Sequence, residues 1–330
     1  MIVADFERIL DLVLESDRIV VVSHTNPDAD AYGSSCGLSL GLRALGKSSA
    51  VFNDHGFIPR YGIIPGAESV KKGAWPELSN RGDLLIVVDC GGIDRVGDSL
   101  VENVKRATNV INIDHHTSNS RFGHLNYVVD GASSTSELVF ELLTALEARV
   151  NRRDLITNDV ASCLMAGIIG DTGSFRYPST TARTFEVAGE LTRRGARPDI
   201  LTQELFATQS LVALRLQSAA LGAVDLSSDG FAEVVVTQEM LKRYGADILD
   251  ADSLAERARD IEGVRVSALY KEDVDLWRVS LRARQGVTDL SIIAGRFGGG
   301  GHKAAAAFRW RGDLASLRER LRAAVTEALS

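Results

Sequence analysis

Side chains that can bind metal ions follow several short apolar runs of the sequence. "RIVVV" leads into "SHTNPDAD", "LLIVV" leads into Asp89, "VINI" leads into "DHH", and "LMAGII" leads into "GDTG". The side chains concerned are His24, Asp28, Asp30, Asp89, Asp114, His115, His116 and Asp171. Carboxylates with a few histidines and without thiolates suit Mn²⁺, Mg²⁺ or similar ions.

The number of these side chains predicts a site for two ions, because four aspartates and two histidines among them already exceed the need of one. Paired ions share a carboxylate and bind both the attacking and the leaving oxygen of a displacement at phosphorus. Taken singly, an aspartate after a strand is commonly a turn or cap residue, and adjacent histidines can lie in a solvated loop. Four separate segments each end in potential ligands at the same predicted edge, and this joint pattern favours a metal site. His55 and His124 lack such company and are interpreted as loop histidines.

Short apolar runs are expected to place these side chains. "RIVVVSH", "SSAVFND", "DLLIVVDC" and "NVINIDHH" are predicted strands, and such runs are typical of a parallel sheet covered on both faces. Helix-like segments, such as "SSTSELVFELLTALEARV" and "TNDVASCLMAGIIGDTG", alternate with or follow them. The pattern predicts a doubly wound α/β domain. Because ligands bind outside the carboxyl ends of such strands, we expect the strand-end residues in one crevice.

Local signals predict how three helices begin. The N-terminal segment "MIVADFERILDLVLESD" is expected to form an amphipathic helix. Ser133 or Ser134 is a suitable N-cap for the helix that follows it. Ser34 and Ser35 open the helix after "DAD" and are interpreted as capping residues, with phosphate binding at that N-terminus as the alternative.

The second half of the chain changes character. Residues from about Thr181 to Leu221 stay helical and polar, and "FAEVVVTQ", "VRVSALYKE" and "LWRVSLRAR" are predicted strands with helices between and after them. The expected organisation is an α/β domain over residues 1–190, a helical linker over 191–222 and a smaller α+β domain over 223–330. We expect the active site in the cleft between the two domains.

The composition restricts the class of protein. The 330 residues are 45% hydrophobic and 25% charged, as in an ordinary globular protein. A net charge of −7 without a visible basic face argues against a grip on long nucleic acid. The apolar runs are too short for a membrane span, and the acidic N-terminal segment is unlike a signal peptide. The scattered Cys36, Cys90 and Cys163 favour a reducing cytoplasm as the location.

Taken together, the motifs resemble those of the DHH phosphoesterase superfamily. "HTNPDAD", "VVDC", "DHH" and "GDTGSF" match its four motifs in order, and "SLRARQGVTDLSIIAGRFGGGGHKAAAAF" resembles the DHHA1 domain. The resemblance covers about Arg18 to Phe308. It is nearest to the stand-alone, two-domain branch of bacterial nano-RNases, which are oligoribonucleases and 3′-phosphoadenosine 5′-phosphate (pAp) phosphatases. It implies a DHH domain that binds metal and a DHHA1 domain that binds substrate.

The resemblance also implies two Mn²⁺ ions per subunit, with Mg²⁺ or Co²⁺ as substitutes. One ion would be held by His24, Asp28 and Asp89, and the other by Asp30, Asp89, His115 and Asp171. Asp89 would therefore bridge the two ions and act in catalysis. His116 would be the second catalytic residue, facing the scissile phosphate or the leaving oxygen. Asp114 would orient the histidine pair.

The predicted substrate-binding residues lie in the DHHA1-like part and are Arg282, Gly299, Gly300, Gly301, His302 and Lys303. A glycine run lets the backbone approach a ligand and direct N–H groups at an anion, although a flexible linker is its simpler explanation. The planar fork of Arg282 suits bidentate binding of a terminal phosphate, whereas Arg284 is interpreted as a solvated edge residue. The chain departs from the common family pattern at Ala29, Ala304 and Ala307.

The expected function is Mn²⁺-dependent hydrolysis of short oligoribonucleotides, linear dinucleotides and pAp by two-metal catalysis. The alternatives are a cyclic-dinucleotide (c-di-AMP) phosphodiesterase, a RecJ-type single-strand exonuclease and a non-catalytic nucleotide sensor. The exonuclease would need more chain and a basic channel, and the sensor a lost ligand, yet every expected ligand is present. The ranking of substrates, the direction of cleavage and the oligomeric state stay open, a homodimer among the alternatives.

Overall fold

The chain folds into two compact units, Met1–Thr208 and Gln209–Ser330. The computed structural model describes residues 5–75, 78, 82–284 and 286–329. The stretch that we predicted as a linker, residues 191–222, is divided between the units. Leu201 and Leu205 pack into the core of the first unit, whereas Leu216 and Ala220 pack into a core of the second.

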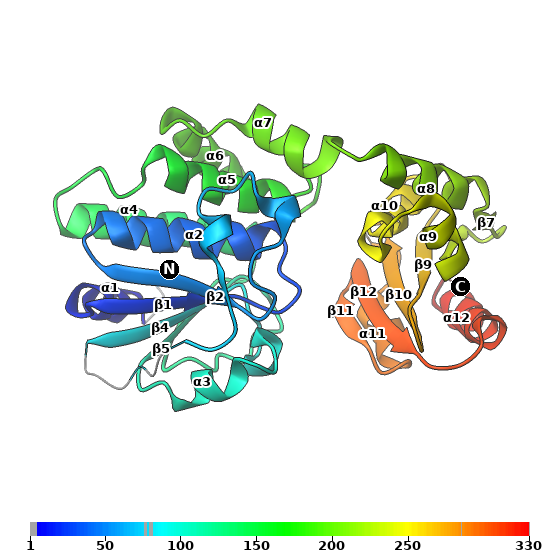
Figure 1. Cartoon of the computed structure of the whole chain (residues 1–330), viewed down its shortest axis with the longest axis horizontal. Coiled ribbons are helices and arrows are strands. Elements are labelled where there is room, and N and C mark those ends of the chain that lie inside the picture. The colour runs from blue at the N-terminus through cyan, green and yellow to red at the C-terminus, as the bar shows by residue number, and fades with distance from the viewer. Residues whose placement is uncertain (1–4, 76–77, 79–81, 285, 330) are drawn as a thin grey trace. The chain divides into compact units, whose positions relative to one another are not determined.

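A parallel sheet forms the centre of the first unit (Figure 1). Its strands are β1 (Arg18–Val22), β2 (Ser48–Asn53), β3 (Lys71–Lys72), β4 (Asp83–Val88), β5 (Val110–Asp114) and β6 (Leu125–Val128). Their order across the sheet is β3-β2-β1-β4-β5-β6, and every neighbouring pair is parallel. The order reverses between β1 and β4, which is therefore the topological switch point of a doubly wound sheet. The predicted α/β fold is confirmed.

Helices cover both faces of this sheet (Figure 1). The α-helices are α1 (Phe6–Glu15), α2 (Ala29–Ala44), α3 (Val101–Arg106), α4 (Thr135–Arg149), α5 (Asn158–Asp171), α6 (Ala182–Arg193) and α7 (Pro198–Thr202). Short 3₁₀ helices are η1 (Pro59–Tyr61), η2 (Ala67–Ser69) and η3 (Ile93–Val96), and η4 (Gln203–Ala207) is a π-helix.

The continuous apolar runs of the strands are explained by burial on both faces. Successive side chains of a strand point to opposite faces of the sheet. Ile19 and Val21 of β1 belong to the core that includes α1, α2, α4 and α5, whereas Val20 and Val22 belong to the core that includes α3. A polar residue on either face would be buried, so the strands are apolar throughout their middle.

Helices α2 and α5 approach closely because each presents glycine to the other. A Cβ atom on Gly33 would lie 2.5 Å from the carbonyl oxygen of Cys163, and one on Gly170 would lie 2.7 Å from Cβ of Ala29. The start of α2 therefore lies beside the end of α5. The methyl group of Ala29, which departs from the common family pattern, fits because residue 170 is glycine.

The second unit contains a mixed sheet of order β11-β12-β10-β9-β8-β7. Its strands are β7 (Asp225–Leu226), β8 (Phe231–Val236), β9 (Val266–Glu272), β10 (Trp277–Ala283), β11 (Gly300–His302) and β12 (Ala305–Trp310). Its helices are α8 (Leu211–Gly222), α9 (Gln238–Tyr244), η5 (Ile248–Ala251), α10 (Leu254–Arg259), α11 (Leu290–Gly295) and α12 (Leu314–Leu329). Only β8 and β9 pair in parallel among the described strands of this sheet. The expected α+β architecture is confirmed.

The glycine run of the second unit leads directly into an edge strand. Gly300, Gly301 and His302 pair with residues 305–307 of β12. A Cβ atom on Gly299 would lie 2.2 Å from the carbonyl oxygen of Ala307, and one on Gly301 would lie 2.5 Å from that of Ala305. The close approach of β12 to this segment therefore requires glycine at residues 299 and 301. A Cβ atom on Gly300 would meet nothing within 4 Å.

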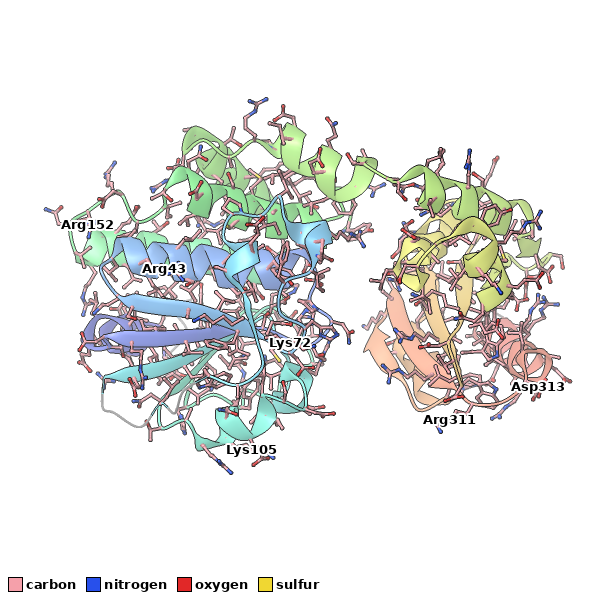
Figure 2. All side chains as sticks on the ribbon, viewed as in Figure 1. Arg43, Lys72, Lys105, Arg152, Arg311 and Asp313 are labelled. Carbon is pink, nitrogen blue, oxygen red and sulfur yellow. The ribbon has the colours of Figure 1, made fainter. Side chains whose placement is uncertain are left out.

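The exterior of each unit carries charged side chains, as Lys105 and Arg152 illustrate in the first unit and Arg311 and Asp313 in the second (Figure 2). The amphipathic pattern of the N-terminus is confirmed, since α1 buries Ile9, Leu10 and Val13. Within the described part of the chain, no helix combines the length and the apolar character needed to cross a membrane.

Candidate active site

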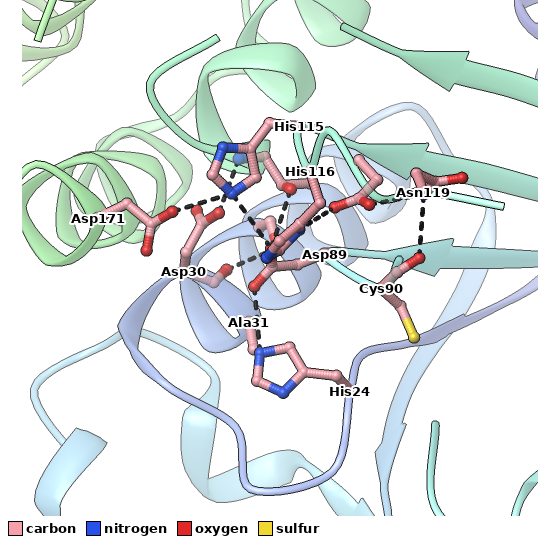
Figure 3. A network of polar contacts seen from close by, with 12 residues as sticks. His24, Asp30, Ala31, Asp89, Cys90, His115, His116, Asn119 and Asp171 are labelled. Atoms are coloured by element: carbon pink, nitrogen blue, oxygen red, sulfur yellow. Dashed lines mark hydrogen bonds and ion pairs between the residues drawn. The ribbon is translucent and has the colours of Figure 1, made fainter. Parts of the chain in front are cut away.

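The side chains predicted as metal ligands meet at the switch point of the parallel sheet (Figure 3). His24 follows β1 and Asp89 follows β4, and these two strands are neighbours. His115 and His116 follow β5 directly. Asp171 is the last residue of α5, which the contact with α2 brings to the same place.

Three overlapping groups of potential ligand atoms form there, and within each group the atoms lie within 4.8 Å of one another. The groups are His24, Asp28 and Asp89; Asp30, His115 and Asp171; and Asp89, His115 and His116. Asp89 is central to them. Its Oδ2 lies 3.3 Å from Nε2 of His24, and its Oδ1 lies 3.7 Å from Nε2 of His115 and 3.8 Å from Nδ1 of His116.

The backbone of Asp89 is in the left-handed region, with φ of +54°. This conformation is uncommon outside glycine, although aspartate tolerates it better than most residues. The backbone N–H of Asp89 donates to the carbonyl of Ile113 at 3.0 Å, so the residue remains attached to β5. Its side chain is only 2% exposed. Strain of this kind is often found at functional sites.

Two histidines have their Nδ1 atoms occupied by the backbone. Nδ1 of His24 contacts the carbonyl oxygen of Thr25 at 2.7 Å, and Nδ1 of His115 contacts that of Ala132 at 3.2 Å. A carbonyl can only accept, so these contacts favour the tautomer with the proton on Nδ1. The other nitrogen, Nε2, faces the carboxylates and is the atom that would bind a metal ion.

The third histidine, His116, is held by a carboxylate. Its Nδ1 contacts Oδ1 of Asp114 at 2.7 Å, and Oδ2 of Asp114 accepts from the side-chain amide of Asn119 at 2.6 Å. Burial alone would raise the pKa of Asp114, but the contact with His116 lowers that pKa below its usual value. Asp114 directly contacts His116 and not His115, which Ala132 holds. The sequence analysis did not identify Asn119, because a single asparagine in a polar loop carries no distinguishing signal.

Asp30 is bound by the N-terminus of α4. The buried carboxylate accepts hydrogen bonds from the backbone N–H groups of Thr135 at 2.7 Å and Ser136 at 3.0 Å. The hydroxyl of Thr135 also donates to Oδ1 of Asp89 at 3.2 Å. Ser134, one of the two predicted capping residues, is confirmed as the N-cap. The sequence analysis interpreted this segment only as a helix start and missed its contacts with two site carboxylates.

The buried carboxylates of the site are close enough together to favour the binding of a cation. Burial, followed by the nearby Asp89 and Asp171, raises the pKa of Asp30 well above its usual value. Burial would lower the pKa of His115, but the facing Asp171 raises it well above the ordinary histidine value. Nε2 of His115 is buried, lies 3.0 Å from Oδ2 of Asp171 and forms no hydrogen bond among the described residues. Crowded carboxylates and an imidazole nitrogen without a hydrogen bond fit a metal ion.

The loop between His24 and Asp28 is fixed by His55, which was not among the predicted site residues. Nδ1 of His55 accepts a hydrogen bond from the backbone N–H of Asn26 at 3.2 Å. His55 is a loop histidine outside the ligand groups, as predicted, and it also fixes this loop. His124 accepts from the backbone N–H of Val110 at 3.0 Å, at the start of β5, and has a structural role.

Asp28, rather than a serine, caps α2. Its Oδ1 accepts from the backbone N–H groups of Asp30 and Ala31, both at 3.0 Å. Ser34 and Ser35 are buried inside the helix, where their hydroxyls donate to the carbonyls of Asp30 and Ala31. The interpretation of these serines as capping residues was therefore wrong.

The predicted substrate-binding residues lie in the second unit. Arg282 is on β10, where its Nε donates to Oε1 of Glu256 at 2.6 Å. Lys303 is exposed between β11 and β12, and Arg284 is exposed and donates to the carbonyl of Ile261. The side chain of His302 lies outside the described part of the structure.

The fold and the site define a class of enzyme. The model of the DHH family N-terminal domain matches residues 18–168, and that of the DHHA1 domain matches residues 232–330. The chain belongs to the DHH family and is a phosphoesterase, a hydrolase of phosphate esters.

Its relatives place it more narrowly. A bifunctional oligoribonuclease and PAP phosphatase of Thermus thermophilus is 34% identical over 315 residues, covering 94% of this chain and 90% of that protein. A cyclic-di-AMP phosphodiesterase of Geobacillus thermodenitrificans is 32% identical over 313 residues, but these cover only 44% of that protein. The crystal structure of an exopolyphosphatase-related protein from Bacteroides fragilis matches with a TM-score of 0.89 at 25% identity, over 98% of this chain and 96% of that one. The resemblance to the stand-alone, two-domain branch is confirmed.

Proposed function

We propose that the chain hydrolyses short oligoribonucleotides and pAp with two Mn²⁺ ions bound at the switch point. One observation carries this proposal: two ligand groups, His24 with Asp28 and Asp89 and Asp30 with His115 and Asp171, lie next to each other. Asp89 and His115, one from each group, are 3.7 Å apart. The whole-length similarity to an oligoribonuclease and PAP phosphatase supports the choice of substrates.

Ions held by these groups would lower the pKa of a water and offset charge on the phosphoryl group. The side chains of the site would position the ions and the substrate. Asp89 belongs to one ligand group and lies 3.7 Å from the histidine of the other. Its carboxylate therefore lies where it would bind both ions. Asp114 fixes the ring of His116 through Nδ1. His116 then holds the scissile phosphate or protonates the leaving oxygen, the work of a general acid.

The same ester bond serves both substrates. In pAp, water attacks the 3′-phosphate, the bond from phosphorus to O3′ breaks, and O3′ gains a proton to give AMP and inorganic phosphate. In a 5′-phosphorylated dinucleotide the same attack on the linking phosphate breaks the same bond and gives two mononucleotides. A dinucleotide is thus pAp with a further nucleoside on the scissile phosphate, so one catalytic centre is sufficient.

Recognition of the terminal phosphate or nucleotide is assigned to the second unit. Arg282, Gly299, Gly300, Gly301, His302 and Lys303 would bind the terminal phosphate or nucleotide. A site that binds one terminal nucleotide favours short substrates. The net charge of −7 gives a long, anionic strand little further attraction.

The cyclic-di-AMP phosphodiesterase is the second candidate, because a 32% identical relative has that activity in its name. Purified protein with Mn²⁺ should be assayed in parallel on pAp, the dinucleotide pApA, c-di-AMP and RNA of graded length. We expect the highest kcat/KM on pApA and pAp. A higher kcat/KM on c-di-AMP would favour the second candidate, and the absence of hydrolysis of all four would overturn the proposal.

A further inference from the structure

A small cavity adjoins the metal-ligand groups within the first unit. Its volume is about 140 Å³, and its walls include Asp28, Asp171, Arg60, Tyr61 and Phe206. Pockets that bury a whole drug-sized ligand are at least about 300 Å³. The cavity therefore suits one planar ring system and not a complete nucleotide.

The segment that carries Arg60 and Tyr61 is fixed to the helix that begins at the site. Tyr32 of α2 is buried, its hydroxyl donates to the carbonyl of Gly56 at 2.5 Å, and it accepts from the backbone N–H of Ile58 at 2.9 Å. Burial raises the pKa of Tyr32 to about 12, so the hydroxyl keeps its proton at neutral pH. The rings of Tyr32 and Tyr61 lie 4.9 Å apart. This wall of the cavity is therefore preorganised relative to Asp28 and Asp30.

Arg60 and Tyr61 place a guanidinium and an aromatic ring next to each other in the cavity wall. The guanidinium of Arg60 lies 5.8 Å from the centroid of the Tyr61 ring. Arg60 is exposed and forms no ion pair with a carboxylate among the described residues. Nucleobases stack on aromatic rings and on guanidinium planes alike. An incoming base would extend an arrangement that exists without it.

Another part of the cavity wall is supplied by the π-helix η4. Phe206 lies there and remains 38% exposed, although most large apolar side chains of the unit are buried. Single π-helical turns occur frequently at functional sites. The exposed part of this phenylalanine, beside the metal-ligand carboxylates, is a surface on which a ring can stack.

We propose that Arg60, Tyr61 and Phe206 form a subsite for the base of the nucleoside that follows the scissile phosphate. This proposal rests on the proposed function and extends it to a second base. The subsite adjoins Asp28 and Asp171, one residue from each of two metal-ligand groups, so a base placed there lies next to a substrate held by those groups. A dinucleotide has this base and pAp lacks it. The subsite therefore selects dinucleotides over pAp, whereas the catalytic centre is common to both.

The test compares the two substrates in Phe206→Ala and Arg60→Gln. The ratio of kcat/KM for pApA to that for pAp should fall about tenfold in each, within the range for loss of one base stack. Leu211→Ala and Arg153→Gln, which alter an exposed leucine and an exposed arginine that do not line the cavity, should leave the ratio as it is. Circular dichroism and Tm would establish that the variants fold.

A change in the substrate gives an independent test. In pApA with an abasic second sugar, the unmodified protein should lose the same factor, and Phe206→Ala should lose no more, because both changes remove one interaction. An equal fall for pAp and pApA, or an unchanged ratio, would overturn the subsite. If the unmodified protein hydrolyses neither substrate, the proposed function itself fails, and the subsite fails with it.

Discussion

The carboxylate of Asp30 accepts a 2.7 Å hydrogen bond from the backbone N–H of Thr135, a residue 105 positions later in the chain. Ser136 donates a second bond at 3.0 Å. The N-terminus of a helix carries partial positive charge and stabilises an anion in this position. The pKa of Asp30 is nevertheless raised, because burial and the neighbouring Asp89 and Asp171 act against ionisation. The helix end compensates only part of the charge, and a metal ion would compensate the rest.

Metal binding should therefore stabilise the protein. Mn²⁺ at a hundredfold excess over its Kd contributes about 2.7 kcal/mol, which corresponds to a rise in Tm of roughly 5–10 °C for a unit of this size. Differential scanning calorimetry with Mn²⁺ and with EDTA measures the difference. Asp171→Asn should lose most of the gain, because its carboxylate belongs to a ligand group. An unaltered Tm on addition of Mn²⁺ to the unmodified protein would contradict the metal site.

Replacement of Asp89 should abolish turnover and weaken the binding of both ions. Asp89→Ala removes the carboxylate but also places alanine at a φ of +54°. Asp89→Asn is the matched variant, because asparagine tolerates that conformation. Activity assays and Mn²⁺ titration calorimetry should give the same loss for both. Asp98→Ala, an exposed residue nearby, is the control. Substantial Mn²⁺-dependent activity in Asp89→Asn would refute the central role of this carboxylate.

The two adjacent histidines should respond differently to substitution. His115→Ala should lower metal occupancy, because Nε2 of His115 faces the carboxylates of Asp171 and Asp89. His116→Ala should keep both ions but slow the chemical step by about a hundredfold or more, as for a lost acid–base group. Anomalous scattering from Mn²⁺ crystals measures the occupancy, and single-turnover kinetics measures the step. Loss of an ion from His116→Ala alone would reverse the roles.

A methyl group at residue 167 should disturb the site by displacing Ser136 and Asp30. A Cβ atom on Gly167 would lie 2.0 Å from Oγ of Ser136 and 2.4 Å from Oδ1 of Asp30. Gly167→Ala should therefore cost about 1–3 kcal/mol, the usual range for overpacking, and should reduce both Mn²⁺ affinity and kcat. Gly189→Ala in α6 meets only a flexible arginine end at 3.9 Å and should stabilise the helix slightly. Urea unfolding and metal titration of the pair test this; equal stability of the two variants would contradict it.

Substrate length should reveal the division of work between the units. We expect kcat/KM to fall as RNA grows from two to roughly twenty nucleotides, a length beyond one binding pocket. His302→Ala and Arg282→Ala should flatten the trend, because short substrates depend most on the terminal contacts. Arg284→Ala is the matched control. Kinetics on end-labelled oligonucleotides decide the matter, and equal or better cleavage of the twenty-mer would favour a processive exonuclease.

The sequence by itself determined the ligand types, their order and the class of fold. Continuous apolar runs indicated strands buried on both faces, since each face of β1 packs into a different core. Ligands at the ends of these runs were expected at one edge, because the carboxyl ends of parallel strands share it. The motif order also sufficed to recognise the family. These properties are local or follow from the period of a strand, and so they can be read without coordinates.

Only the tertiary structure decided which segments become neighbours. The pairing of β1 with β4, the seating of Asp30 on α4 and the glycine contacts between α2 and α5 join residues far apart in the chain. No local pattern encodes such contacts, because they depend on how all the layers pack together. The same holds for the cavity beside Arg60 and Phe206, whose walls come from four segments spread along the chain from Asp28 to Phe206.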